Sequence, residues 1–236
     1  MSLKIPFFAA FGLLFVSGLF AQQNKNENFE QLFPYDFQKA TRFLTNEKWM
    51  DDSIRKHQLN PKEVLAIIFP ELIRYNSIQD KIETLTLETL YIQYGKDYAN
   101  FSIGEFQIKP SFAEKAEIDF LKLYGEKKLR EHFNIQSGDT TQSELNRAKR
   151  LKRMKGQAGM VNYLCLFWKI MTAKYPAWKN KEEQIKFLAS AYNCGYWKPK
   201  KKIEAYESKN FFHTGLVITS TKYCYADIAW YFYQLP

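Results

Sequence analysis

A single glutamate, Glu71, lies inside an apolar stretch whose residues recur at helical spacing. Ile67 and Ile68 precede it by four and three residues, so in a helix they share its face. A carboxyl group in such surroundings loses hydration in its charged form, which favours the protonated form that a general acid needs. Arg74, three residues further on, favours the charged form of Glu71 if its side chain points inward. From this stretch alone, a solvated glutamate paired with Arg74 is the simpler interpretation, because most helical glutamates are surface charges.

A second stretch, residues 100–110, places polar groups and a flat ring around a glycine. Gly104 permits a backbone conformation or a close approach that a side chain would block. Ser102 and Gln107 can both donate and accept hydrogen bonds, and Phe106 offers an apolar face. Such a loop suits a polar ligand such as a sugar, although an ordinary turn before a helix is the better interpretation of this stretch taken alone.

A third stretch ends a predicted helix with Tyr192, Asn193 and Gly195. The hydroxyl and the amide could face a cleft, but Asn and Gly are also common where helices end. Judged separately, none of the three stretches identifies a site. Their order along the chain is more specific than any one of them.

The ordered set resembles the soluble lytic transglycosylase family of the lysozyme-like superfamily. That family carries a catalytic Glu on a helix, then a Gly-Leu-Met-Gln-like segment leading into a Pro and a helix, then an Ala-Tyr-Asn-x-Gly segment. Glu71, the run from Gly104 to Pro110 and the run from Ala191 to Gly195 correspond to these parts. The resemblance covers about residues 60–200 and implies an all-α, lysozyme-like fold, with a short β-hairpin or loop near the active-site cleft.

The chain departs from the family pattern in three places. Leu72 stands where the family usually has Ser after the Glu, and Glu105 and Phe106 replace the usual Leu-Met pair. The insert from residue 78 to residue 100 is also longer than expected. These departures affect the expected substrate geometry more than the expected fold, and they leave open an inactive descendant that only binds.

The resemblance implies cleavage of the β-1,4 bond between N-acetylmuramic acid and N-acetylglucosamine in peptidoglycan. Glu71 would act as the single acid/base, first protonating the glycosidic oxygen and then taking the proton of the muramic acid C6 hydroxyl to close a 1,6-anhydro ring. The resemblance implies no cofactor and no metal. The residues expected to bind the substrate are Ser102, Gly104, Phe106, Gln107, Tyr192 and Asn193.

Ordinary glycosidases need a second carboxylate as nucleophile or base. No second carboxylate is convincing here, since Asp80, Glu83 and Glu88 all fall in the insert. Glu105 is the one to watch, because it lies in the ligand-like loop. The alternatives left open are a lysozyme-type hydrolase, a non-catalytic wall-binding protein and, ranked lowest, a basic binder of nucleic acid or membrane. The expected partner is the peptidoglycan glycan strand, not nucleic acid, and the protein is expected to be a monomer.

The first 21 residues have the pattern of a cleavable export signal. Lys4 precedes an apolar run that ends at Ala21, before a polar stretch. A membrane anchor is the less favoured interpretation, because the run is slightly short for a span. We therefore expect export to the periplasm or beyond, with residues 22–33 as a flexible leader and residues 34–236 as one catalytic domain.

The formal net charge of +9 suits an exported protein that meets a polyanionic surface, and the charge alone does not choose among cell-wall polymer, lipid headgroups and extracellular nucleic acid. Two basic clusters stand out. The predicted helix over residues 147–155 is interpreted as a solvated face, with peripheral contact to wall or membrane as the alternative. Lys198 and the lysines at 200–202 are the better candidates for gripping substrate carboxylates.

The three cysteines allow at most one internal disulfide. Cys165 lies in an apolar run and is expected to be a buried free thiol, whereas pairing of Cys194 with Cys224 is left open. The three histidines are isolated, so the sequence predicts no metal site. Apolar periodicity predicts about eight helices, including a buried central helix over residues 157–175.

Overall fold

The computed structural model describes residues 27–75, 77–214 and 221–236, and the predicted mostly helical fold is confirmed. The α-helices of this described part are α1 (Phe29–Leu32), α2 (Pro34–Asn46), α3 (Trp49–Lys56), α4 (Pro61–Arg74), α5 (Ser77–Tyr94), α6 (Pro110–Phe133), α7 (Glu144–Lys155), α8 (Gln157–Lys174), α9 (Lys181–Cys194), α10 (Lys200–Glu204) and α11 (Tyr225–Gln234). A 3-10 helix, η1 (Ser137–Thr140), precedes α7, and β1 (Asn210–Phe212) pairs antiparallel with β2 (Tyr223–Cys224).

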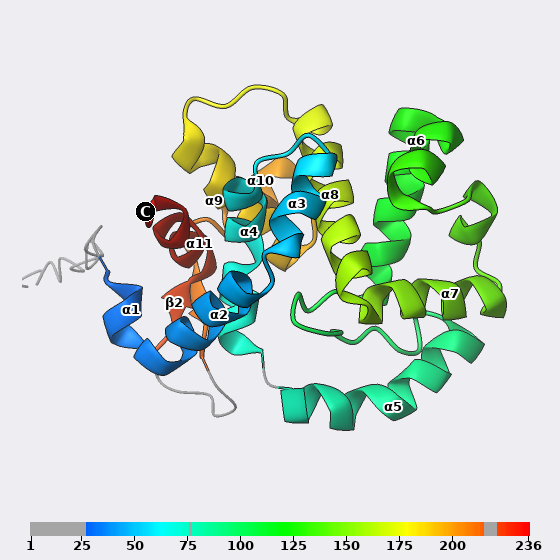
Figure 1. Cartoon of the computed structure of the whole chain (residues 1–236), viewed down its shortest axis with the longest axis horizontal. Helices are drawn as coiled ribbons and strands as arrows, with labels where there is room; N and C mark the ends of the chain where they lie inside the picture. Colours follow the sequence, from blue (N-terminus) through cyan, green and yellow to red (C-terminus); the bar gives the residue numbers. More distant parts are fainter. Residues whose placement is uncertain (1–26, 76, 215–220) are drawn as a thin grey trace, which may run out of the picture.

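Helix α8 lies between two groups of helices (Figure 1). It contacts α3, α4 and α9 in one group and α6 and α7 in the other. Val161, Leu164, Leu166 and Phe167 are all fully buried, so this helix is covered on every side. A helix that is apolar all round belongs in a core. The prediction of a central buried helix is therefore confirmed.

Helix α4, which carries Glu71, begins with a strong start signal. The side chain of Asn60 accepts a hydrogen bond from the Lys62 amide at 3.0 Å, and Pro61 occupies the first helical position. The helix continues without interruption through Pro70, although a proline interior to a helix predicts a break there. Packing against α2, α9 and α11 holds the helix together across this point.

The C-terminal end of α4 is fixed by a lysine from α2. Lys39 Nζ donates to the carbonyl oxygens of Ile73 and Tyr75 at 3.0 and 2.9 Å. These two bonds satisfy acceptors that the end of a helix leaves without a backbone partner. The two bonds therefore attach the last turn of α4, which carries Glu71, to α2.

A buried network of charges joins the helices of the second group. Arg150 and Glu117 are fully buried, and Nε and Nη2 of Arg150 each lie 2.9 Å from Glu117 Oε2. Arg153 Nη2 and the Tyr163 hydroxyl donate to the other carboxylate oxygen at 2.8 and 2.5 Å. Burial lowers the pKa of Arg150, but the adjacent Glu117 carboxylate and the Tyr91 and Tyr163 hydroxyls together more than offset this, and the pKa is raised. The guanidinium therefore stays charged.

The basic run over residues 147–155 is thus not a solvated face throughout, and that interpretation is wrong for two of its arginines. Arg147 and Arg150 point inward, where Arg147 donates to the carbonyls of Ile92 and Gln93 at the end of α5. The spacing of the charges gives no sign of this burial, because their partners come from distant parts of the chain.

Other boundaries differ locally from the predictions. The expected flexible leader ends earlier, because Phe29 and Phe33 are buried and α1 belongs to the domain, while the predicted signal at 1–21 lies outside the described residues. Within α6, the non-helical Gly125 separates two helical stretches. All three cysteines are free thiols, and Cys165 is buried as expected. No helix in the described ranges has the length and apolar character needed to cross a membrane.

Candidate active site

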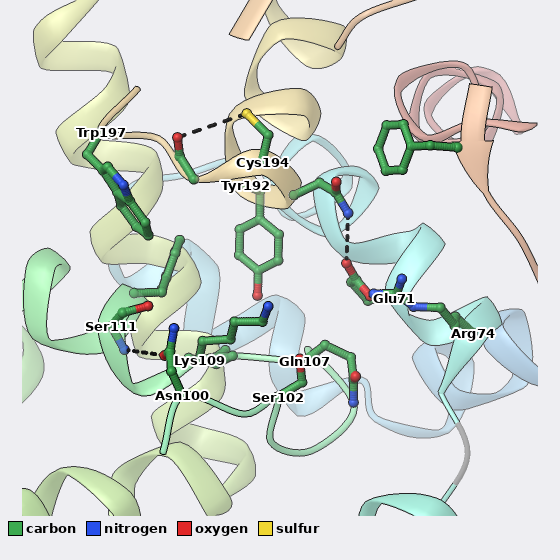
Figure 2. A pocket seen from close by; sticks show the side chains of 15 residues that line it. Glu71, Arg74, Asn100, Ser102, Gln107, Lys109, Ser111, Tyr192, Cys194 and Trp197 are labelled. Carbon is green, nitrogen blue, oxygen red and sulfur yellow. Dashed lines mark hydrogen bonds and ion pairs between the residues drawn. The ribbon is translucent and has the colours of Figure 1, made fainter. Parts of the chain in front are cut away.

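The three stretches singled out in the sequence meet around one cavity of about 360 Å³. Glu71 comes from α4, Ser102 and Gln107 come from the loop before α6, and Tyr192 and Asn193 come from the end of α9 (Figure 2). The further lining residues are Arg74, Asn100, Ile108, Lys109, Ser111, Phe112, Cys194, Gly195, Trp197 and Phe211.

Glu71 is 3% exposed and lies in the last turn of α4. Arg74 Nη2 donates to its Oε2 at 2.6 Å, and Asn193 Nδ2 donates to its Oε1 at 3.4 Å. The Glu71 carboxylate raises the pKa of Arg74, so the arginine is charged. The sequence offered a solvated glutamate paired with Arg74 as the simpler interpretation. The pairing is present, but the glutamate is buried.

The loop before α6 is a tight turn rather than an irregular segment. Ile103 and Ile108 form an antiparallel bridge, and the Gln107 amide and side-chain Nε2 both donate to the Gly104 carbonyl, at 3.0 and 2.8 Å. Gly104 has a φ of +65°, and a Cβ there would lie 2.7 Å from Met160 Sδ. The glycine is therefore required both for the left-handed backbone and for the close approach, as its position predicted.

Phe106 does not have the role that the sequence suggested. Its ring is fully buried in the core, so it offers no face to a ligand. Its carbonyl oxygen instead accepts a hydrogen bond of 2.7 Å from the Tyr192 hydroxyl. Burial, and then the nearby Glu71 carboxylate, raises the pKa of Tyr192 well above its ordinary value, so the hydroxyl remains a donor. Tyr192 therefore ties the end of α9 to the loop.

We expect Tyr192→Phe to lower the free energy of unfolding by about 1–3 kcal/mol, because it leaves the buried Phe106 carbonyl without its partner. Urea denaturation followed by circular dichroism measures this change. Tyr231→Phe is the matched control, since that hydroxyl bonds to the exposed side chain of Asn28 and its loss should cost under about 0.5 kcal/mol. Equal costs for the two variants would contradict the anchoring role of Tyr192.

Glu71 is the sole carboxylate among the described residues that line the cavity. Glu105, the favoured second candidate, is absent from the lining, and Glu88 pairs with Lys155 at 2.7 Å on the other group of helices. The side chains of Asp80 and Glu83 lie outside the described part of the chain. The cavity thus offers one proton donor or acceptor of the carboxyl type, surrounded by amides and hydroxyls.

The cations at the cavity are not the ones that the sequence favoured. The lysines at 198 and 200–202 do not line it, and Lys198 instead lies over the ring of Tyr206. Lys109 and Arg74 line it in their place. Trp197 was not among the predicted site residues, although an aromatic residue two positions after the predicted helix end at Gly195 was a usable signal.

Within the described residues, no group of His, Cys, Asp and Glu is arranged to hold a metal ion. Glu71 is the carboxyl group at the cavity that could transfer a proton, and the amides and hydroxyls around it offer hydrogen bonds. Comparison of the chain with protein-family models, with curated proteins and with solved structures found no match in any of the three.

Proposed function

We propose that this protein is a peptidoglycan lytic transglycosylase with Glu71 as its single acid/base. The observation that carries the proposal is the position of Glu71. It is a nearly buried carboxylate, without a second carboxylate in the described cavity lining, brought together with Gln107 and Asn193 from two distant segments. The order of these segments in the sequence resembles the soluble lytic transglycosylase family, which adds independent support.

In the first step, the protonated carboxyl group of Glu71 donates its proton to the oxygen of the glycosidic bond. The bond between that oxygen and C1 of N-acetylmuramic acid breaks, and N-acetylglucosamine leaves as the alcohol. The acetamido group of the substrate stabilises the cation that develops at C1, because no enzyme carboxylate in the described cavity lining is available for this purpose. Ser102, Gln107 and Asn193 are the polar side chains placed to hold the sugar.

In the second step, ionised Glu71 accepts the proton of the C6 hydroxyl, and the C6 oxygen bonds to C1. The product is a 1,6-anhydro ring, and no water is consumed. The same carboxyl group ends the cycle protonated, as it began. One carboxylate is therefore sufficient for the whole reaction, in contrast to the two that a hydrolase uses.

A second candidate function, non-catalytic binding of peptidoglycan, is favoured by the ion pair between Glu71 and Arg74 at 2.6 Å. An adjacent guanidinium favours the ionised form of a carboxyl group, whereas the first step needs the protonated form. In the catalytic proposal, Arg74, whose side chain is 33% exposed, turns away when substrate enters. In the binding proposal the pair persists, and the cavity only holds the glycan.

The export expected from residues 1–21 would deliver the protein to the periplasm or beyond, where peptidoglycan is found. The proposed partner is the glycan strand itself. A peripheral contact with the wall or membrane would use exposed lysines such as Lys152 and Lys155, because Arg147 and Arg150 are buried.

Digestion of purified peptidoglycan sacculi tests the proposal. The protein without residues 1–21 and its Glu71→Gln variant are incubated with sacculi, and the soluble products are identified by mass spectrometry. We expect fragments with a 1,6-anhydro end from the unsubstituted protein alone. Fragments heavier by one water would indicate a hydrolase. Sedimentation with sacculi without any released fragment, across a range of pH, would support the binding function and overturn the catalytic one.

A further inference from the structure

Trp197 is unusual among the apolar side chains of this protein. It is 43% exposed, and of the large hydrophobic residues exposed in the described part of the chain it alone lines the cavity. Figure 2 shows Trp197 and Glu71 on opposite sides of Tyr192. The indole therefore lies on one side of the cavity and Glu71 on the other.

The indole is held in position by its neighbours. Gly195 has a φ of +98°, and a Cβ at this residue would lie 2.9 Å from Cζ2 of the Trp197 ring. The ring thus lies directly against a stretch of backbone without a side chain. The Lys198 amide donates to the Gly195 carbonyl at 3.1 Å and closes the turn that carries the tryptophan.

The residue before the tryptophan anchors this turn in the core. Tyr196 is 1% exposed, and its hydroxyl donates to Asp119 Oδ2 at 3.0 Å. Its ring meets the Trp197 ring edge-on, with centroids 5.5 Å apart and an interplanar angle of 72°. Because the exposed ring is fixed in advance, little side-chain entropy is lost when a ligand packs on it.

The remainder of the cavity is rich in polar groups. Asn100, Ser102, Gln107 and Ser111 all supply hydrogen-bonding atoms to the lining. Lys109 is exposed and forms no ion pair within the described residues. A rigid aromatic face beside amides, hydroxyls and a free cation matches a pyranose ring, which has an apolar face of C–H groups, a polar rim and, in muramic acid, a carboxyl substituent.

We propose that Trp197 is a positioning residue that stacks on a sugar ring of the glycan on the side of the cavity opposite Glu71. This inference rests on the proposed function, since the stacked sugar belongs to the same strand whose bond Glu71 cleaves. Stacking fixes the register of the strand relative to Glu71. It adds binding energy without taking part in proton transfer.

The test measures binding of a soluble N-acetylglucosamine tetramer by calorimetry in the Glu71→Gln background. We expect Trp197→Ala to weaken binding about tenfold, and Trp197→Phe to stay within about threefold of the parent, because phenylalanine keeps a flat apolar face. Tyr98→Ala is the matched control, since Tyr98 is 71% exposed but does not line the cavity, and its affinity should be unchanged.

A spectroscopic readout separates stacking from a structural role. Binding of the tetramer should change the tryptophan fluorescence of the parent, and this change should disappear in Trp197→Phe while the affinity remains. With Glu71 present and sacculi as substrate, Trp197→Ala should raise KM about tenfold and leave kcat within about twofold. Equal losses in Trp197→Ala and Trp197→Phe, or tetramer affinities within twofold for the parent and Trp197→Ala, would overturn the inference.

The outcomes also distinguish this inference from the proposed function. If the unsubstituted protein releases no fragments but Trp197→Ala still loses tetramer binding, the catalytic function is wrong and the stacking role of Trp197 is supported. If fragments are released with an unchanged KM in Trp197→Ala, the catalytic function is supported and the stacking role of Trp197 is wrong. If the parent binds no tetramer at millimolar concentration, the stacking role of Trp197 is also excluded.

Discussion

Glu117→Ala should lower the free energy of unfolding by about 3–5 kcal/mol, because it removes the carboxylate nearest to the buried Arg150 and to the partly buried Arg153, whose other carboxylate partners lie 3.6 Å or more away. Arg150 is fully buried, and Arg153 is 20% exposed at its side chain. The Tyr163 hydroxyl loses its acceptor as well. Arg150 has no exposed surface. Water can therefore reach its charge only if the packing of α6 against α7 and α8 opens.

Urea denaturation followed by circular dichroism measures this loss, and Glu204→Ala is the matched control. Glu204 pairs with Lys200 at 3.5 Å on the exposed α10, and an exposed pair of this kind contributes under about 0.5 kcal/mol. If Glu117→Ala yields no folded protein, Glu117→Gln keeps the volume and part of the hydrogen bonding, and it should still lose more than Glu204→Ala. A cost for both Glu117 variants that is no larger than the control would refute the structural role of the network.

Glu71→Gln should reduce the rate of fragment release from sacculi by about 10⁴-fold. General acid–base catalysis by one group contributes about 10²–10⁴-fold, and Glu71 is proposed to act first as the acid and then as the base. Glutamine has nearly the same shape but cannot exchange a proton. Glu71→Asp keeps the carboxyl group but withdraws it by one methylene, and a displacement of this size should cost about 10²-fold.

Glu105→Gln is the matched control for this series, because Glu105 belongs to the neighbouring loop but does not line the cavity. Its rate should stay within about twofold of the unsubstituted protein. Thermal melting of each variant checks that the fold is retained. A large rate loss in Glu105→Gln together with a small one in Glu71→Gln would place the catalytic carboxyl group in the loop and contradict the assignment of Glu71.

Local patterns were sufficient to predict most helices and the three stretches of the site. The glycine at 104 and the apolar run over residues 157–175 each depend on neighbours in the sequence, and the structure has these features where they were expected. Gln107 and Asn193 were assigned to a common site from their order along the chain, and both line the cavity.

The wrong or missing assignments concern the direction in which side chains point. Phe106 was assigned to the ligand and Arg150 to the solvent, but both are fully buried. Whether a ring packs inward or an arginine finds a buried carboxylate depends on residues that are far away in the sequence. Trp197 was missed for the converse reason, since its exposure at the cavity results from the turn at Gly195 and not from any periodic pattern.

The hydrogen bonds around Glu71 join parts of the chain that are synthesised at very different times. Asn193 lies 122 residues after Glu71, and the Tyr225 hydroxyl reaches the Ile67 carbonyl across 158 residues. Helix α11, which begins at Tyr225, packs on both α4 and α9. A growing chain therefore carries Glu71 long before it can build the surroundings of this carboxylate. The cavity lining extends to Phe211, so a chain that ends before this residue has the acidic residue but lacks the finished site.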